Sequence, residues 1–148
     1  MKGFHYSFQK VVDLKGNEKT QAEWMLSSAL GELQAQEQSL GELKRQRSEL
    51  MDALLNAAEQ KTPVAKICEM QNYVDYLDAC IARKLGDISR AHKQVQEKQD
   101  HLSSKVLDEK VWLKARDKAK LAFQQDMNLR EQNELDEMAT VRFAMKSH

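Results

Sequence analysis

Hydrophobic residues recur with alternating spacings of four and three along two long stretches of the chain. Hydrophobic residues make up 41% of the sequence, yet they hold eight of the ten spaced positions in the first stretch and nine of the eleven in the second. Such spacing predicts an α-helix with an apolar seam, the pattern of a coiled coil. The positions are Ala22, Leu26, Ala29, Leu33, Gln36, Leu40, Leu43, Arg47, Leu50 and Leu54, then Ile67, Met70, Val74, Leu77, Ile81, Lys84, Ile88, Ala91, Val95, Lys98 and Leu102.

A single proline separates the two stretches. Pro63 follows Gln60, Lys61 and Thr62, and both flanking stretches are rich in helix formers. Thr62 is a suitable cap for the second helix, and Pro63 fits its first turn, where a missing N–H costs nothing. The sequence therefore predicts one helix over about 5–59, a hinge at 60–63 and a second helix over about 64–142.

A hinge of four residues lets the two seams pack against each other within one chain. Folding back at the hinge brings together residues whose numbers sum to about 121. The predicted neighbours are Leu54 and Ile67, Leu43 and Leu77, Leu33 and Ile88, and Leu26 and Val95. The expected fold is all-α: a two-helix antiparallel coiled coil, or long helical hairpin, that forms a single domain over 1–148.

The second helix is too long to be covered by the first. The same rule places Phe8 beside Leu113, so the chain beyond about Asp117, roughly 30 residues, lacks an intrachain partner and is expected to overhang. After Leu102 the apolar pattern also changes phase, because Val106 and Leu113 fit only with a four-residue stutter. We interpret this shift as a local change in supercoiling.

Composition agrees with a thin helical protein in the cytoplasm. Aromatic residues are 6% and charged residues 31%, which leaves little material for a thick core. The mean hydropathy is −0.70, and no apolar run approaches the ~20 residues that span a bilayer. The first ten residues do not resemble a secretion signal. Cys68 and Cys80 lie 12 positions apart on one predicted helix, too far to form a disulfide, as expected in a reducing compartment.

The residues of enzyme and nucleic-acid sites are missing. The four histidines are scattered, the five glycines stand singly, and neither a phosphate loop nor a nucleophile elbow is present. The 23 basic and 23 acidic residues give zero net charge, which does not favour nucleic acid as a partner. We expect no enzyme activity, catalytic residue, cofactor, metal or small-molecule substrate.

Two surface features can each be interpreted either as a site of interaction with a partner or as an ordinary part of a helical hairpin. Tyr73, Tyr76 and Cys80 widen the apolar band near the hinge, either as an interaction surface or as the edge of a broad core. Residues 105–120 carry six basic and three acidic side chains, whereas 126–137 carry five acidic and one basic. This charge polarity either orients the helix in a charged socket or belongs to solvated helix faces.

Two segments resemble the family of the flagellar export protein FliJ, a coiled-coil component of the flagellar type III export apparatus. The first is Phe4-His-Tyr-Ser-Phe8-Gln-Lys-Val-Val12, which is similar to the family's aromatic opening followed by Gln-Lys. The second runs from Met70 through Tyr73 and Leu77 to Ile81, just after the turn. The resemblance extends over nearly the whole chain.

This resemblance implies a stalk like the γ subunit of rotary ATPases, serving protein export and thus motility. The paired helix ends would bind the hexameric export ATPase FliI through Phe4, Phe8, Leu113 and Phe123. Tyr73, Leu77 and Cys80 would contact the cytoplasmic part of the membrane export gate FlhA. Export chaperones would be further partners. The protein would be cytoplasmic and peripherally associated with the membrane apparatus.

Two other functions share this architecture. One is the equivalent stalk of a virulence-type III secretion system, which differs in the N-terminal aromatic motif. The other is a generic coiled-coil scaffold or holding chaperone, for which we expect a stable parallel dimer or client binding without any effect on an ATPase.

Overall fold

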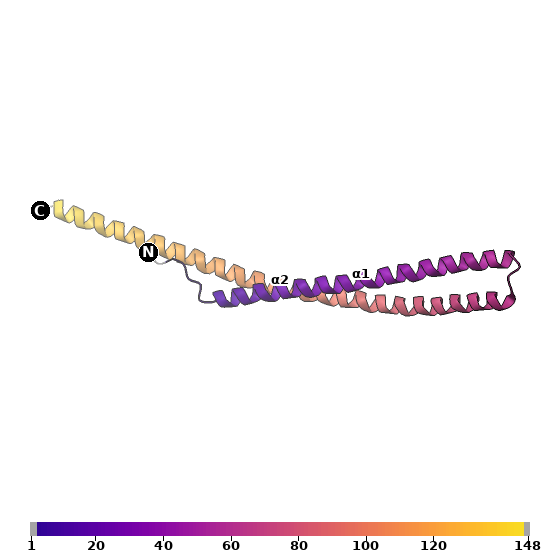
Figure 1. Cartoon of the computed structure of the whole chain (residues 1–148). Coiled ribbons are helices and arrows are strands. Elements are labelled where there is room, and N and C mark those ends of the chain that lie inside the picture. Colours follow the sequence, from indigo (N-terminus) through magenta and orange to yellow (C-terminus); the bar gives the residue numbers. More distant parts are fainter. Residues whose placement is uncertain (1–2, 147–148) are drawn as a thin grey trace. The chain divides into compact units, whose positions relative to one another are not determined.

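A computed structural model describes residues 3–146 and contains two long helices (Figure 1). Helix α1 spans Gln9–Glu59 and helix α2 spans Val64–Lys146, and the described residues outside them are 3–8 and 60–63. The two helices pack against each other. The predicted all-α helical hairpin with an overhanging C-terminal helix is therefore confirmed.

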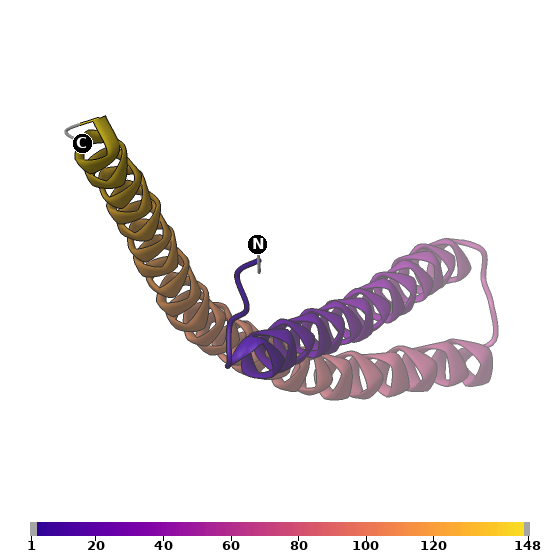
Figure 2. The ribbon, with the colours of Figure 1, turned by 90° about the vertical axis from the view of Figure 1, so that its left-hand side faces the viewer.

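Residue contacts divide the chain into two compact units. The hinge unit is Gln21–Ser103, and the terminal unit combines Met1–Thr20 with Ser104–His148. In the hinge unit the two helices run side by side in opposite directions from the turn at 60–63 (Figures 1 and 2). The single domain over 1–148 stays a prediction.

The hinge unit has the predicted seam and register. All 21 positions of the 4-3 pattern are buried or half-buried, and Leu77 and Val74 are the most enclosed, with 1% and 2% of their surfaces exposed. Lys84 Nζ donates a hydrogen bond of 2.9 Å to Gln36 Oε1, and Arg47 pairs with Asp78. The numbers of these partners sum to 120 and 125, within about one helical turn of the predicted register.

The turn between the helices closes α1 with a Schellman-type cap. The Thr62 N–H donates to the Ala57 carbonyl at 3.4 Å, and Lys61 has a φ of 51°, in the left-handed region that usually holds glycine. The Pro63 carbonyl accepts from the N–H groups of Lys66 and Ile67 at 3.1 and 3.3 Å. Pro63 therefore occupies the N-cap of α2, and Thr62, predicted to be that cap, instead terminates α1 through its backbone.

Helix α1 begins at Gln9, four residues later than predicted. The Phe8 carbonyl accepts from the N–H groups of Val11 and Val12 at 3.0 and 3.1 Å, so Phe8 is the N-cap residue. Residues 3–8, which we call the strap, are not helical. The rings of Phe4 and Phe8 pack on α2.

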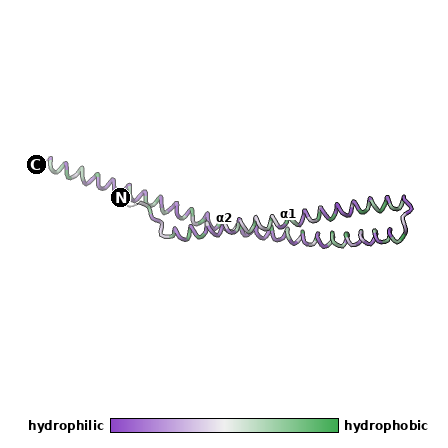
Figure 3. The backbone as a smooth tube through the Cα atoms, in the orientation of Figure 1, coloured by the Kyte–Doolittle hydropathy of each residue, from purple (hydrophilic) through white to green (hydrophobic). Residues whose placement is uncertain are grey.

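The hydropathy of both helices alternates along their whole length (Figure 3). Short apolar stretches follow each other at helical spacing, with polar residues between them, and this alternation continues to the end of α2. Within residues 3–146, neither helix is apolar enough over a sufficient length to cross a membrane.

Candidate functional site: an aromatic strap and a tyrosine surface

Five aromatic rings form a continuous chain of contacts in the terminal unit. Phe4 lies 5.6 Å from Phe123 between ring centroids, and Phe8 lies 5.9 Å from Trp112. Tyr6 joins them, at 6.4 Å from Phe4 and 5.7 Å from Phe8. Edge-to-face and tilted pairs at these distances are favourable, so the strap is held on α2 at both of its ends.

This cluster contains three of the four residues predicted for the ATPase end, namely Phe4, Phe8 and Phe123. Leu113 is half-buried, but the side chain that contacts Phe8 is its neighbour Trp112. Sequence analysis missed Tyr6 and Trp112. Extending the 4-3 spacing beyond Leu102 without a stutter would have found Trp112, because the unshifted positions include both Trp112 and Phe123.

The strap shifts the start of the overhang. Phe123 and Met127 are half-buried, and every described residue from 128 to 146 is exposed. The predicted start near Asp117 assumes a helical N-terminus, which advances only ~1.5 Å per residue. A non-helical segment can advance up to ~3.6 Å per residue, which allows the strap to reach Phe123, farther along α2 than a helix of the same six residues would.

Charged residues occupy the helix seam of the terminal unit, between residues 15–19 of α1 and 105–109 of α2. Lys15 pairs with Asp108 at 2.9 Å, Lys19 with Glu109 at 2.8 Å, and Lys105 with Glu18 at 3.2 Å. The Asp108 carboxylate beside Lys15 raises the pKa of that amine above its ordinary value.

These pairs also explain the apparent change of phase. The unshifted positions Lys105, Glu109, Trp112, Arg116 and Ala119 are all half-buried, and so are Val106 and Leu113 of the shifted pattern. The buried face of α2 thus continues in its original phase and becomes wider. Only the apolar residues within it change position.

The residues predicted for the export gate lie in the hinge unit and differ in exposure: Tyr73 is exposed, Cys80 is half-buried and Leu77 is buried. Tyr73 and Tyr76 are 50% and 57% exposed, with ring centroids 5.9 Å apart. Cys80 is half-buried and accepts a hydrogen bond of 3.4 Å from Arg83 Nη2. Cys80, which lies beside Tyr76, raises the pKa of the Tyr76 hydroxyl. Leu77 is buried in the seam between the helices, so its side chain packs in the core and does not form part of the exposed surface.

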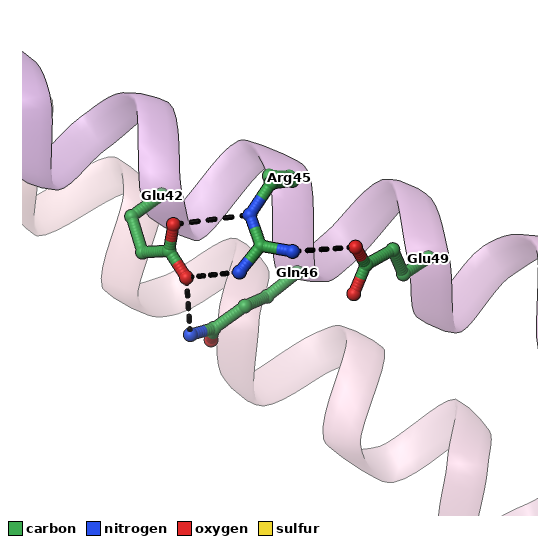
Figure 4. A network of polar contacts seen from close by, with 4 residues as sticks. All are labelled: Glu42, Arg45, Gln46 and Glu49. Carbon is green, nitrogen blue, oxygen red and sulfur yellow. Dashed lines mark hydrogen bonds and ion pairs between the residues drawn. The ribbon is translucent and has the colours of Figure 1, made fainter.

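Helix α1 contributes a polar border to the tyrosine surface. A shallow hollow beside Tyr73 is lined on α1 by Gln46, Glu49 and Leu50. Figure 4 shows Arg45 held between Glu42 and Glu49, while Gln46 Nε2 donates to Glu42 at 3.3 Å. The hydrogen bond from Arg45 is the main cause that lowers the pKa of Glu42. We call Tyr73, Tyr76 and Cys80, with this hollow, the tyrosine surface.

Both sites offer contact surface for a partner. Among residues 3–146, no group of three His, Cys, Asp or Glu side chains is arranged to hold a metal ion. The strap presents aromatic edges, the overhang presents exposed apolar side chains, and the tyrosine surface combines rings with a thiol and a hydrogen-bonding border. These are features of protein interaction surfaces.

Comparison with known proteins agrees with this geometry. The family described as Flagellar FliJ protein matches residues 4–148. The Flagellar FliJ protein of Bacillus subtilis (strain 168) is 23% identical over 145 residues, which cover 98% of this chain and 99% of that protein. The structure of a putative YscO homologue from Chlamydia trachomatis superimposes with a TM-score of 0.68 at 14% identity and covers 98% of both chains. That likeness concerns the fold.

Proposed function

Because the chain belongs to the Flagellar FliJ protein family, we propose that it is a stalk of the flagellar type III export apparatus. In this function it catalyses nothing itself. It is cytoplasmic, binds and promotes the hexameric export ATPase FliI, and links that ATPase to the membrane export gate FlhA. The observation that carries the proposal is the family match over residues 4–148, together with two separate contact surfaces on one helical hairpin.

The terminal unit is the proposed ATPase end. Its exposed overhang carries large apolar side chains, and the strap fixes the other chain end beside them through Phe4 and Phe8. In this proposal the paired helix ends enter the ATPase ring. The overhang supplies the contacts, and the strap with the charged seam supplies the rigidity.

The tyrosine surface of the hinge unit is the proposed site for the export gate. Half-exposed aromatic rings are typical anchors of protein interfaces, because they bury much area with few rotatable bonds. Tyr73 and Cys80 are the proposed contacts, and Leu77 acts by holding the helix beneath them. Export chaperones are further proposed partners of this unit.

ATPase stimulation tests the first part of the proposal. Purified FliI-type ATPase is assayed for hydrolysis rate and hexamer formation with the wild-type chain, with Phe123→Ala and with Trp24→Ala. Trp24 is 70% exposed in the hinge unit and serves as the matched aromatic control. We expect stimulation by the wild-type chain and by Trp24→Ala, and a reduced effect of Phe123→Ala. An unchanged ATPase rate and unchanged ring formation with the wild-type chain would reject the proposal.

Binding to the cytoplasmic part of FlhA tests the second part. Tyr73→Ala is expected to weaken this binding about ten-fold, since truncating an interface anchor costs about 1–2 kcal/mol. Circular dichroism verifies that the variant keeps its helices, and Trp24→Ala is again the control. Equal gate affinity of a fully helical Tyr73→Ala protein would remove Tyr73 from the proposed site.

A further inference from the structure

A second stripe of residues runs along the outside of α2 in the terminal unit. It starts at residue 107 and ends at 143, and all eleven of its positions are exposed. Ten steps over 36 residues give 3.6 residues per step, the period of an α-helix, so the stripe stays on one side of a straight helix. Its members, which we call the outer stripe, are Leu107, Val111, Lys114, Lys118, Leu121, Gln125, Leu129, Gln132, Asp136, Ala139 and Phe143.

The outer stripe is exposed and yet more apolar than the chain as a whole, in which 41% of residues are hydrophobic. Six of its eleven members are apolar, and Leu107, Val111, Leu121 and Leu129 have 56–65% of their surfaces exposed. The strap and α1 pack on the seam positions of α2, such as Trp112 and Glu109, which lie on a different side of the helix. Apolar residues that recur at helical spacing on one exposed face are typical of a helix face that packs on another helix.

The outer stripe is complementary to the same stripe of a second chain that runs in the opposite direction. Its spacings read the same in both directions from Gln125, so a second α2 running antiparallel about Gln125 meets it position by position. Apolar positions then face apolar positions: Leu121 faces Leu129, Val111 faces Ala139, and Leu107 faces Phe143. Lys114 faces Asp136, and a two-fold axis repeats every pair.

Charge selects this antiparallel arrangement. Residues 105–120 carry six basic and three acidic side chains, and residues 126–137 carry one basic and five acidic. An antiparallel pair centred on Gln125 places each basic segment against the acidic segment of the other chain. A parallel pair would place Lys114 on Lys114 and Asp136 on Asp136, and like charges in direct contact disfavour association.

From these observations we infer that two copies of this chain associate through their outer stripes as an antiparallel dimer with its axis at Gln125. The occupant of the stripe is thus the same stripe of a second copy. The dimer goes beyond the proposed export function, and it covers part of the overhang assigned there to the ATPase. Dissociation of the dimer would therefore precede binding to the ATPase ring.

Sedimentation equilibrium of the purified full chain tests this dimer, without any export component, so its outcome is separate from that of the ATPase assay. In low salt, the mass is expected to rise with concentration from 17.1 kDa towards twice that value. Added salt is expected to weaken the dimer, since it screens the exposed Lys114–Asp136 pairs. If the measured mass stays that of one chain at protein concentrations up to a few hundred micromolar, the inference is overturned. The stripe would then be a candidate contact for a helix of another protein.

Charge reversal tests the pairing. Lys114→Asp or Asp136→Lys alone turns two attractive pairs into repulsive ones, and each is expected to raise the dissociation constant about ten-fold or more. A mixture of the two single variants restores both pairs and is expected to associate about as well as the wild-type chain. In a parallel dimer neither single variant would change the number of like-charge contacts, so wild-type affinity of both would also overturn the inference.

The control variant makes the same chemical change on another side of the helix. Lys120 is exposed on α2 and lies outside the outer stripe. Lys120→Asp alters the net charge and the helix propensity as Lys114→Asp does, but it is expected to leave the dissociation constant within about two-fold. An equal loss in both variants would assign the effect to net charge and would contradict the pairing.

Discussion

Lys19 Nζ lies 2.8 Å from Glu109 Oε1, and both side chains occupy seam positions where the hinge unit has mostly apolar residues. Their side chains are 31% and 16% exposed, so the pair is partly withdrawn from water. A polar pair inside a coiled-coil seam specifies register at a cost in stability. The terminal unit is therefore expected to be less stable against local opening than the hinge unit.

Replacing one partner of this pair is expected to lower the free energy of unfolding more than replacing both partners with apolar residues. Glu109→Ala leaves the Lys19 amine partly buried without this carboxylate and should lower the free energy of unfolding by about 1 kcal/mol or more. The double variant Lys19→Leu/Glu109→Leu extends the apolar seam and should be at least as stable as the wild type. Urea unfolding followed by circular dichroism measures both. A double variant less stable than Glu109→Ala would contradict this account.

Two glycines of α1 give a matched test of space around the helix. A Cβ at Gly41 would meet nothing within 4 Å, whereas one at Gly16 would lie 3.1 Å from Glu109 Oε2. Gly41→Ala should stabilise the chain by about 0.5–1 kcal/mol through helix propensity. Gly16→Ala should gain less, because the Glu109 carboxylate must move. Thermal unfolding compares the two, and a larger gain at Gly16 would be inconsistent with the packing.

The left-handed residue of the turn is a site for stabilisation. Lys61 adopts a φ of 51°, which costs a residue with a Cβ about 1 kcal/mol relative to glycine. Lys61→Gly should therefore raise the free energy of unfolding by up to about 1 kcal/mol. Gln60→Gly, one residue earlier, is the control and should be neutral or destabilising. If Lys61→Gly lowers the melting temperature, the Schellman-type cap does not govern this turn.

Tryptophan fluorescence reports on the strap. In a Trp24→Phe background, Trp112 is the remaining tryptophan, and it packs against Phe8. Phe8→Ala should expose the indole and shift its emission to the red. Phe4→Ala removes the more distant contact with Phe123 and should shift the emission less. Equal emission from all three proteins would mean that the strap does not lie on α2 in solution.

Stability separates the two kinds of residue near the tyrosine surface. Leu77 is 1% exposed, so Leu77→Ala should cost about 2–4 kcal/mol, while Tyr73→Ala, at 50% exposure, should stay within about 1 kcal/mol of the wild type. Chemical denaturation measures both. The consequence for gate binding is that only the Tyr73 variant tests contact, because Leu77→Ala also alters the fold. A Tyr73 variant as unstable as the Leu77 variant would place both in the core.

Much of the fold follows from local patterns. The 4-3 spacing and Pro63 predicted both helices, the turn and the register, because each is set by residues close in sequence or by the period of the helix. The pair of Gln36 with Lys84 lies within one residue of that register, and the pair of Arg47 with Asp78 lies within about one helical turn of it.

The missed features depend on residues far apart in sequence. The strap stays non-helical because Phe4 and Phe8 pack on Phe123 and Trp112, which no local propensity reveals. The predicted change of phase after Leu102 depends on the apolar residues alone, whereas the buried face also includes charged positions. The charged pair of Lys19 and Glu109 fills the same positions with a different interaction. Both features lie in the terminal unit.

The antiparallel hairpin also implies an order in which the parts of the chain fold. Residues on either side of Pro63 need the shortest loop to meet, so we expect helix pairing to start at the turn and to grow towards the chain ends. Phe4 and Phe123 lie far apart in the sequence, so their contact closes a much longer loop than contacts near the turn do. We therefore expect the strap to dock on α2 late in folding, after helix pairing has extended outwards from the turn.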